Sequence, residues 1–338
     1  MNFLVIGLGS MGKRRIRNLQ ALNKNNIFGF DLKECRCKEA SEKYKIKTFN
    51  NFEESLKVVN PQVFIISTPP DLHMKYAYIA QENNIHTFIE ASVIHSEKIL
   101  KLSKKIENTD LIIVPSCTMN YFPFTKKIKE LLQTNIIGTA LNFNYHTGQF
   151  LEDWHPWEKI EDYYVSKRST GAGREIVPFE LTWLNNIFGI AKPLACVKKK
   201  LTTMNTNIDD IYHCILEYPN NLIANLTVEV ISRPEATREF RILGQDGIII
   251  YSADSNTIKY KNTSMQDWKI INFDKGHIEK QYINPEEPYI NEIKDFLYAI
   301  ENKDISLFPN SLIKDYNILN TLYTLENLTG DNLDDLPR

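Results

Sequence analysis

The chain has 338 residues, 43% hydrophobic and 24% charged, which is typical of a globular protein large enough for two domains. Its 40 basic and 42 acidic residues are spread along the whole length and give a formal net charge of −2. Because no basic stripe is available to neutralise phosphates, the composition argues against nucleic acid and anionic membrane surfaces as partners.

The N-terminus, the lack of a long apolar run and the cysteines favour a cytoplasmic protein. The N-terminus runs directly into a strand-like segment, so we expect no signal peptide. No apolar run approaches the roughly 20 residues of a spanning helix. The five cysteines lack C-x-x-C spacing, which argues against a disulfide framework or a zinc site. His146, Asp153 and His155 form a loose cluster without helical spacing, and we therefore expect no metal.

Strand-like and helix-like segments alternate through the first third of the chain. Apolar periodicity typical of a helix follows residue 12, begins again after Asp71, a predicted N-cap, and returns at 98–106. Strands that alternate with helices predict a parallel, doubly wound sheet, and we assign residues 1–118 to a Rossmann domain. The predicted strands are 2–6, 27–30, 63–67, 87–89 and 111–114.

The pattern changes after about residue 119. A helix is predicted at 124–132, and turn signals at Asn220-Asn221 and Asp246-Gly247 separate longer alternating segments. We assign residues 119–338 to a substrate and oligomerisation domain of α+β class, with a mostly antiparallel open sheet and helices on one face. Its last helices, within 288–326, are candidates to pack back across the domain junction. The predicted strands are 139–147, 211–218, 222–231 and 237–243, and the last helices 289–300 and 311–325.

A glycine motif joins the first predicted strand to the first helix. Gly7, Gly9 and Gly12, with Ser10 and Met11 between them, form G-x-G-x-x-G, the fingerprint of dinucleotide binding in this context. The glycines allow a tight turn and a close approach of the backbone to a pyrophosphate, which meets free N–H groups and the positive end of the helix dipole. The alternative is a close strand–helix crossing in a sheet that binds no nucleotide.

An acidic residue follows at the spacing that the fingerprint requires. Asp31 ends the second strand, where it is expected to accept hydrogen bonds from the ribose hydroxyls and to repel a 2′-phosphate. This favours NAD, although Lys33 and Arg36 weaken the preference and leave NADP open.

Further residues that are candidates to bind the cofactor follow the third predicted strand. Thr68, Pro69 and Pro70 are expected to line the cofactor cleft near the middle of the sheet, with a plain strand terminator as the alternative. We place His73 in the same set, with a helix-cap or packing role as its alternative.

These motifs together resemble the glucose-fructose oxidoreductase / inositol dehydrogenase family of NAD(P)-dependent sugar oxidoreductases, over essentially the full length. Segment 145–157 is similar to one in members from bacterial surface-sugar and nonulosonate pathways. The resemblance implies a cofactor role for Glu90 and a sugar, sugar phosphate or nucleotide sugar as substrate. The matching stretches are 7–12, 66–73, 88–90, 138–139 and 183–189.

Two positions depart from the family pattern. The family usually carries Glu-Lys-Pro after its fifth strand, with a catalytic lysine, whereas this chain has Ala91 after Glu90. The family also usually has Asp-x-Gly-x-His in its second domain, with the histidine as acid/base, and the corresponding position here is Phe179. An alignment shifted by one residue places Glu180 there.

Residues that could replace the missing acid/base histidine lie close to Phe179 in the sequence. Glu175 or Glu180 is expected to handle a proton if partial burial raises its pKa, and Arg174 to hold a carboxylate or phosphate. Alternatively, Glu175 only complements the helix dipole and pairs with Arg174.

The segments before them offer substrate contacts. Trp154 and Trp157 are suited to stacking on a pyranose ring, and His155 to reaching a hydroxyl or carrying a proton; anchoring a loop at an interface is the alternative. Lys167 and Arg168 suit an anionic group on the substrate, or form a solvated charge pair.

Three functions stay open. The first is an NAD(P)-dependent sugar oxidoreductase of surface-glycan biosynthesis, with hydride transfer at a domain cleft. The second keeps the dinucleotide but recycles it during an elimination or epimerisation without net redox. The third is a non-catalytic Rossmann-fold sensor or accessory protein. We expect a homodimer or homotetramer, because the antiparallel sheet resembles the surface through which the family forms dimers.

Overall fold

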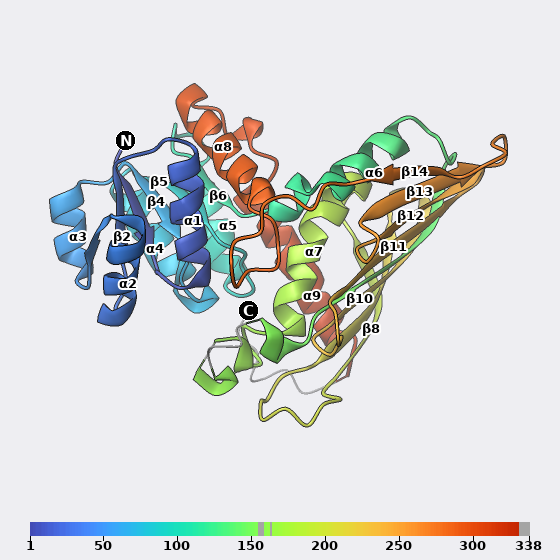
Figure 1. Ribbon diagram of the computed structural model, residues 1–338, viewed down its shortest axis with the longest axis horizontal. Helices are drawn as coiled ribbons and strands as arrows, with labels where there is room; N and C mark the ends of the chain where they lie inside the picture. Colours follow the sequence, from blue (N-terminus) through green and yellow to red (C-terminus); the bar gives the residue numbers. More distant parts are fainter. Residues whose placement is uncertain (155–158, 163, 331–338) are drawn as a thin grey trace. The chain divides into compact units, whose positions relative to one another are not determined.

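A computed structural model describes residues 1–154, 159–162 and 164–330. The chain divides into two compact units. Unit 1 contains Met1–Tyr121 and Gly276–Tyr316, and unit 2 contains Phe122–Lys275 and Asn317–Arg338. Each unit is built around its own sheet (Figure 1).

Unit 1 holds a six-stranded sheet in the order β3-β2-β1-β4-β5-β6. Every pair of neighbouring strands is parallel, which confirms the predicted doubly wound sheet. The strand order reverses between β1 and β4, and in open α/β sheets ligands bind outside the carboxyl ends of the strands at such a switch point. The strands are β1 (Phe3–Ile6), β2 (Ile27–Phe30), β3 (Lys47–Phe49), β4 (Val63–Ile66), β5 (His86–Ile89) and β6 (Ile113–Pro115).

Side chains that alternate along these strands are buried on both faces of the sheet. Phe3 and Val5 of β1 belong to a core that includes residues of helices α1, α2 and α8. On the other face, Phe64 of β4 contacts the ring of Phe52 in α3. The helices are α1 (Ser10–Ala21), α2 (Glu34–Tyr44), α3 (Phe52–Val59), α4 (His73–Glu82), α5 (Ser96–Ile106) and α8 (Glu287–Asn302).

Unit 2 holds an eight-stranded sheet in the order β14-β13-β12-β11-β7-β10-β9-β8. Only β7 and β10 pair in parallel, which confirms the predicted mostly antiparallel sheet. At the predicted turn between β9 and β10, Asn220 and Asn221 have positive φ angles of 64° and 58°. The strands are β7 (Ala140–Gly148), β8 (Lys192–Lys199), β9 (Ile211–Tyr218), β10 (Leu222–Glu229), β11 (Thr237–Gly244), β12 (Gly247–Ser252), β13 (Thr257–Asn262) and β14 (Lys269–Asn272).

One face of this sheet is covered by helices. The rings of Phe240 in β11 and Tyr145 in β7 contact Trp183 in α7, with centroids 5.5 and 5.2 Å away. The buried rings alternate along each strand with residues on the opposite face, such as Asn144 and Arg241. The helices of unit 2 are α6 (Pro123–Gln133), α7 (Gly173–Phe188) and the part of α9 (Leu312–Asn327) from residue 317 onward.

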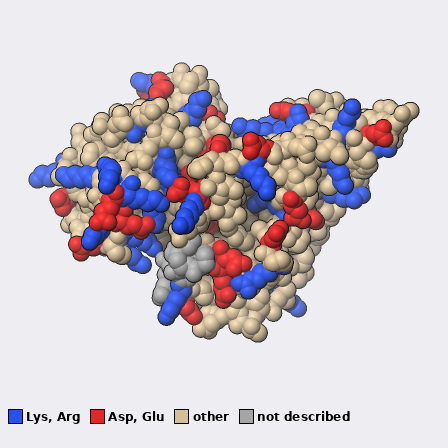
Figure 2. Space-filling view, viewed as in Figure 1, with Lys and Arg blue, Asp and Glu red and all other residues tan. Residues whose placement is uncertain are grey.

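The surface carries mixed charge. Basic and acidic side chains alternate on the face shown in Figure 2, in agreement with the near-zero net charge. Within the described part of the chain, no helix combines the length and hydropathy needed to cross a membrane.

Candidate functional site

The three motif glycines have different surroundings in unit 1. Gly7 has φ +90°, and a Cβ there would lie 2.6 Å from the carbonyl oxygen of Ser67. A Cβ on Gly12 would lie 1.8 Å from the carbonyl oxygen of Gly7. A Cβ on Gly9 would meet only the flexible guanidinium of Arg36, at 3.6 Å. Gly7 and Gly12 are therefore required for the turn to pack, whereas Gly9 leaves the backbone open to a ligand.

Helix α1 begins at this turn without a side-chain cap. Gly9 is its N-cap and offers no side chain to the N–H groups of the first turn, which include those of Ser10 and Met11. Both residues are half-buried. A helix start with free N–H groups binds anions such as a pyrophosphate.

Asp31 is fixed beside the turn. Its Oδ2 accepts the backbone N–H of Leu8 at 2.8 Å, and its Oδ1 accepts the N–H of Lys33 at 2.8 Å. One guanidinium nitrogen of Arg36 lies 3.7 Å from Oδ2. The carboxylate and a cation are thus both held at the end of β2, where an adenosine ribose binds in this fold.

The different surroundings predict different effects of adding a methyl group. We expect Gly9→Ala to fold normally and to bind NAD about 10–100-fold more weakly, because one or two charge-assisted hydrogen bonds to the pyrophosphate are lost. Gly12→Ala is expected to lower the thermal midpoint of unfolding as well. Calorimetry of folding and titration with NADH check both. Unchanged NADH affinity in a folded Gly9→Ala variant would contradict this assignment.

The loop after β4 presents unpartnered polar atoms. Thr68 Oγ1 and His73 Nδ1 are buried and have no hydrogen-bond partner among the described residues. The other ring nitrogen of His73 lies 2.8 Å from the carbonyl oxygen of Thr68, and burial lowers the pKa of His73. Pro69 and Pro70 end the strand segment. The predicted cap was wrong, because Asp71 lies within a 3-10 turn, Pro70–Leu72, and α4 starts after Leu72.

Glu90, directly after β5, belongs to a buried charge network that was not predicted from the sequence. The Arg15 guanidinium bonds Glu90 at 2.6 and 3.0 Å and lies 2.9 Å from Glu292 of α8. Glu292 also accepts from the backbone N–H of Cys117 and the hydroxyl of Thr118, both at 2.6 Å. Burial alone would lower the pKa of Arg15, but the two carboxylates outweigh it and raise that pKa. The network joins the helix that follows the glycine turn to the end of β5.

In unit 2, the start of α7 holds Glu175. Its Oε1 accepts a hydrogen bond of 2.7 Å from the hydroxyl of Tyr164, and its Oε2 is buried without a partner among the described residues. Burial raises the pKa of Glu175 to about 7. A carboxyl group with such a pKa is suited to general acid/base catalysis near neutral pH.

The backbone around Glu175 is unusual. Ala172, the N-cap of α7, has φ 55° and ψ −132°, a conformation that non-glycine residues rarely adopt and that is typical of functional sites. Pro178 lies inside the helix and cannot donate the backbone hydrogen bond that other residues in a helix interior donate.

Two other predicted residues of α7 have protein partners. Arg174 is 1% exposed and forms hydrogen bonds of 2.6 and 3.1 Å with Glu326. Glu180 is fully buried and accepts from Tyr145 at 2.7 Å and from Arg238 at 2.9 Å. Their roles in substrate binding and catalysis stay predictions, but these contacts favour structural roles.

The remaining substrate candidates lie on the segments before α7. Trp154 donates to the carbonyl oxygen of Gln149 at 3.3 Å and packs on a small apolar cluster. Arg168 lies 3.3 Å from Asp209. Lys167 is exposed. His155 and Trp157 lie outside the described residues. Within the described ranges, no three His, Cys, Asp or Glu side chains are grouped so that they could hold a metal ion.

Two family models match this chain. Residues 1–116 match the model described as "Oxidoreductase family, NAD-binding Rossmann fold", and residues 125–250 match the "GFO/IDH/MocA C-terminal domain". The chain belongs to the GFO/IDH/MocA oxidoreductase family. The resemblance seen in the sequence is therefore confirmed, as is the dinucleotide-binding type of the N-terminal domain.

The chain is similar to several known proteins at low sequence identity. D-xylose 1-dehydrogenase (NADP(+)) from Hypocrea jecorina is 23% identical over an alignment of 238 residues, which covers 64% of this chain and only 60% of the relative. Among solved structures, an oxidoreductase from Agrobacterium radiobacter in complex with NAD+, L-tartaric acid and magnesium has a TM-score of 0.84 at 12% identity, with 98% and 96% of the two chains covered. Levoglucosan dehydrogenase has a TM-score of 0.83 at 16% identity, covering 98% and 97%. UDP-N-acetylglucosamine 3-dehydrogenase from Acidithiobacillus ferrooxidans has a TM-score of 0.76 at 17% identity, covering 97% of each chain.

Proposed function

We propose that this protein is an NAD(P)-dependent dehydrogenase that oxidises a hydroxyl group of a sugar, sugar phosphate or nucleotide sugar, or reduces the corresponding ketone or aldehyde. The observation that carries the proposal is Glu175, a carboxyl group whose Oε2 has no partner among the described residues and whose pKa is about 7, in a chain of this family. The three relatives that are named as dehydrogenases of sugars or a nucleotide sugar support this substrate class.

The residues of unit 1 fit a dinucleotide. The pyrophosphate would lie on the backbone at Gly9 and on the first N–H groups of α1, and Asp31 would accept the ribose hydroxyls. Thr68 and His73 each offer a buried polar atom that has no other partner among the described residues. When bound, the nicotinamide ring exchanges a hydride with the substrate.

Glu175 is the proposed proton carrier. In the direction of oxidation its carboxylate takes the proton of the reacting hydroxyl, and in the direction of reduction its protonated form returns it. Tyr164 holds the other carboxyl oxygen, which fixes the side chain at the start of α7. Glu175 would thus replace the acid/base histidine that the family usually has at the position of Phe179.

The pathway, the location and the substrate contacts that we propose are based on the sequence. We place the enzyme in bacterial surface-glycan biosynthesis in the cytoplasm, with Lys167 and Arg168 near the anionic group of a phosphorylated or nucleotide-linked sugar. Trp154 would pack against the sugar.

The test is turnover. Purified protein is offered NAD+ or NADP+ with a panel of free sugars, sugar phosphates and nucleotide sugars, and reduced nicotinamide is followed by its absorbance. Product that forms without a lasting change in absorbance, detected by mass spectrometry, identifies a recycled cofactor and overturns the net dehydrogenase. Bound dinucleotide without turnover of any sugar identifies a non-catalytic protein.

Arg36 should set the choice between the two cofactors. We expect Arg36→Ala to weaken NADPH binding about tenfold or more and to leave NADH binding nearly unchanged, because a 2′-phosphate loses one charge-assisted contact at the end of β2. Paired titrations with NADH and NADPH measure this. Lys13→Ala, which removes an ion pair with Glu39 at the surface of α1, is the control. Equal losses for both cofactors would contradict the assignment.

We also propose a homo-oligomer, a dimer or tetramer, formed through the sheet face of unit 2 opposite α7. Val197 of β8, Ile223 of β10 and Ile270 of β14 expose 54%, 37% and 62% of their surface, and Ile223 and Val197 alternate with buried neighbours. Light scattering after size exclusion should show an oligomer at micromolar concentration, and Ile223→Glu should shift it toward the monomer. A monomeric wild type would contradict this proposal.

A further inference from the structure

A buried carboxyl group that the proposed function does not use lies in unit 1, where it contacts the loop that follows β5. Asp315 of α9 is 3% exposed and forms a hydrogen bond with the hydroxyl of Ser92, which is 4% exposed. Oδ2 of Asp315 is buried and has no partner among the described residues. Burial raises the pKa of Asp315 to about 7. A protonated side chain is therefore available there at neutral pH, and it has no role in the proposal above.

Ser92 follows β5 at the carboxyl end of the parallel sheet, the edge at which ligands bind in open α/β sheets. β5 is the neighbour of β4, whose carboxyl end flanks the switch point of the strand order. Of the residues that follow β5, Glu90 is bound to Arg15, and the half-buried Ala91 carries no polar group. Ser92 is therefore the first residue after β5 whose side chain has a polar group that is not part of an ion pair.

We propose that Ser92 holds the oxygen of the reacting hydroxyl or carbonyl group of the substrate, and that Asp315 is the positioning residue that orients the Ser92 hydroxyl. While Asp315 is ionised, the Ser92 hydroxyl donates to its carboxylate, which favours the charged form. Once protonated, Asp315 donates to Ser92 Oγ instead, which leaves the Ser92 proton free to point at the substrate oxygen. This inference rests on the proposed function and complements Glu175, which carries the proton. It gives this chain a hydrogen-bond donor next to Ala91, where the family resemblance predicts a lysine.

Substitutions of Asp315 separate orientation from other roles. Asn presents an N–H donor to Ser92 Oγ as a protonated Asp does, so Asp315→Asn should retain kcat within a few fold. Asp315→Ala removes the donor and should lower kcat about tenfold or more, with KM little changed. Ser92→Ala should lower kcat about 10²-fold, the usual effect of losing one donor to a reacting oxygen, and Ser92→Thr should restore most of it.

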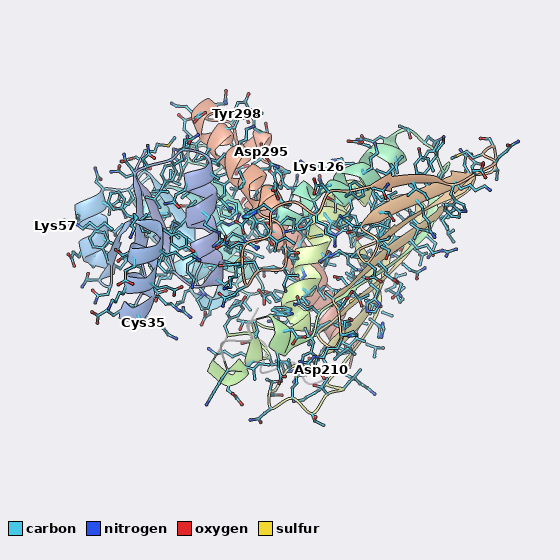
Figure 3. All side chains as sticks on the ribbon, viewed as in Figure 1. Cys35, Lys57, Lys126, Asp210, Asp295 and Tyr298 are labelled. Atoms are coloured by element: carbon cyan, nitrogen blue, oxygen red, sulfur yellow. The ribbon has the colours of Figure 1, made fainter. Side chains whose placement is uncertain are left out.

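Two readouts do not depend on turnover. Glu175 also has a pKa of about 7 and contributes to the protonated carboxyl band at pH 6. The infrared spectrum of the cofactor-free protein at that pH should therefore lose, in Asp315→Asn, only the component of the band that Asp315 contributes. Titration with NADH should give the same affinity for all four variants and the wild type. The control is Asp295→Asn on α8, the carboxylate that accepts from the hydroxyl of Tyr121 at 3.0 Å and is labelled in Figure 3; it should change neither kcat nor that band.

The outcomes are distinct. If the wild type is active and Ser92→Ala keeps the wild-type kcat, this inference alone is overturned. The same holds if the kcat of Asp315→Asn is as low as that of Asp315→Ala. A wild type that oxidises none of the sugars overturns the proposed function and this inference with it. Loss of kcat in Ser92→Ala and Asp315→Ala, with recovery in Ser92→Thr and Asp315→Asn, supports the pair.

Discussion

Glu175→Gln is expected to lower kcat about 10²–10⁴-fold while the affinity for NADH stays unchanged, because the amide cannot take the proton of the substrate hydroxyl. The shape of the side chain is retained, and the hydrogen bond from Tyr164 is kept by the amide oxygen. Folding should therefore be preserved, and circular dichroism verifies this. Steady-state kinetics with the sugar identified in the substrate panel measure the effect.

The pH dependence follows from the raised pKa of about 7. A base must be deprotonated, so kcat for oxidation should fall as the pH decreases below about 7, and the rate of reduction should fall as the pH rises above it. Tyr164→Phe removes the hydrogen bond that favours the carboxylate, so it should raise this pKa and move both limbs to higher pH. The exposed Glu161 provides the matched control, since Glu161→Gln should leave the profile unchanged. Wild-type kcat in Glu175→Gln would refute the assignment.

Arg15→Met should destabilise unit 1 by about 3–5 kcal/mol, because it leaves two carboxylates without their cation in a buried environment. Arg15 has no exposed surface, and Glu90 and Glu292 both depend on it. Replacing all three residues, as Arg15→Met with Glu90→Gln and Glu292→Gln, should recover much of that loss, since no buried charge then stays unpaired.

The measurement must report on unit 1 alone. All four tryptophans belong to the residues of unit 2, so tryptophan fluorescence follows that unit. Hydrogen exchange of peptides from α1 and β5 reports on unit 1, and protection there should drop in Arg15→Met. Arg241→Met, on an exposed position of β11, is the control. If protection is unaffected, the network contributes little to stability.

Much of the fold could be predicted because the spacing of apolar residues and the residues that form turns are local properties of the sequence. The alternation of short apolar runs with helices defined the parallel sheet, and the two-residue period with Asn220-Asn221 defined the antiparallel one. β3 was missed because three residues are too few to show a period. The glycine turn could be recognised in the sequence because its backbone conformation and close packing allow only glycine at two of its positions.

The buried charges were not predicted, although the sequence contains a signal for them. Arg15, Glu292 and Asp315 each occupy a position of a helix where the spacing of neighbouring apolar residues requires a buried side chain. A charge in an apolar stripe indicates a buried partner, but the partner comes from a distant segment. Arg174 shows the same limit: its neighbour in sequence suggested a pairing with Glu175, whereas the structure pairs it with Glu326.

The proline inside α7 has a consequence for motion. Pro178 has no N–H and cannot donate the backbone hydrogen bond that other residues in a helix interior donate, so the first turn, which carries Glu175, has one such hydrogen bond fewer to the rest of the helix. That turn should open with a lower free energy than the turns around Trp183, and amide exchange should show it as a separate, faster unit. The residue proposed to move the proton thus lies on a segment that can open while the helix behind it stays closed.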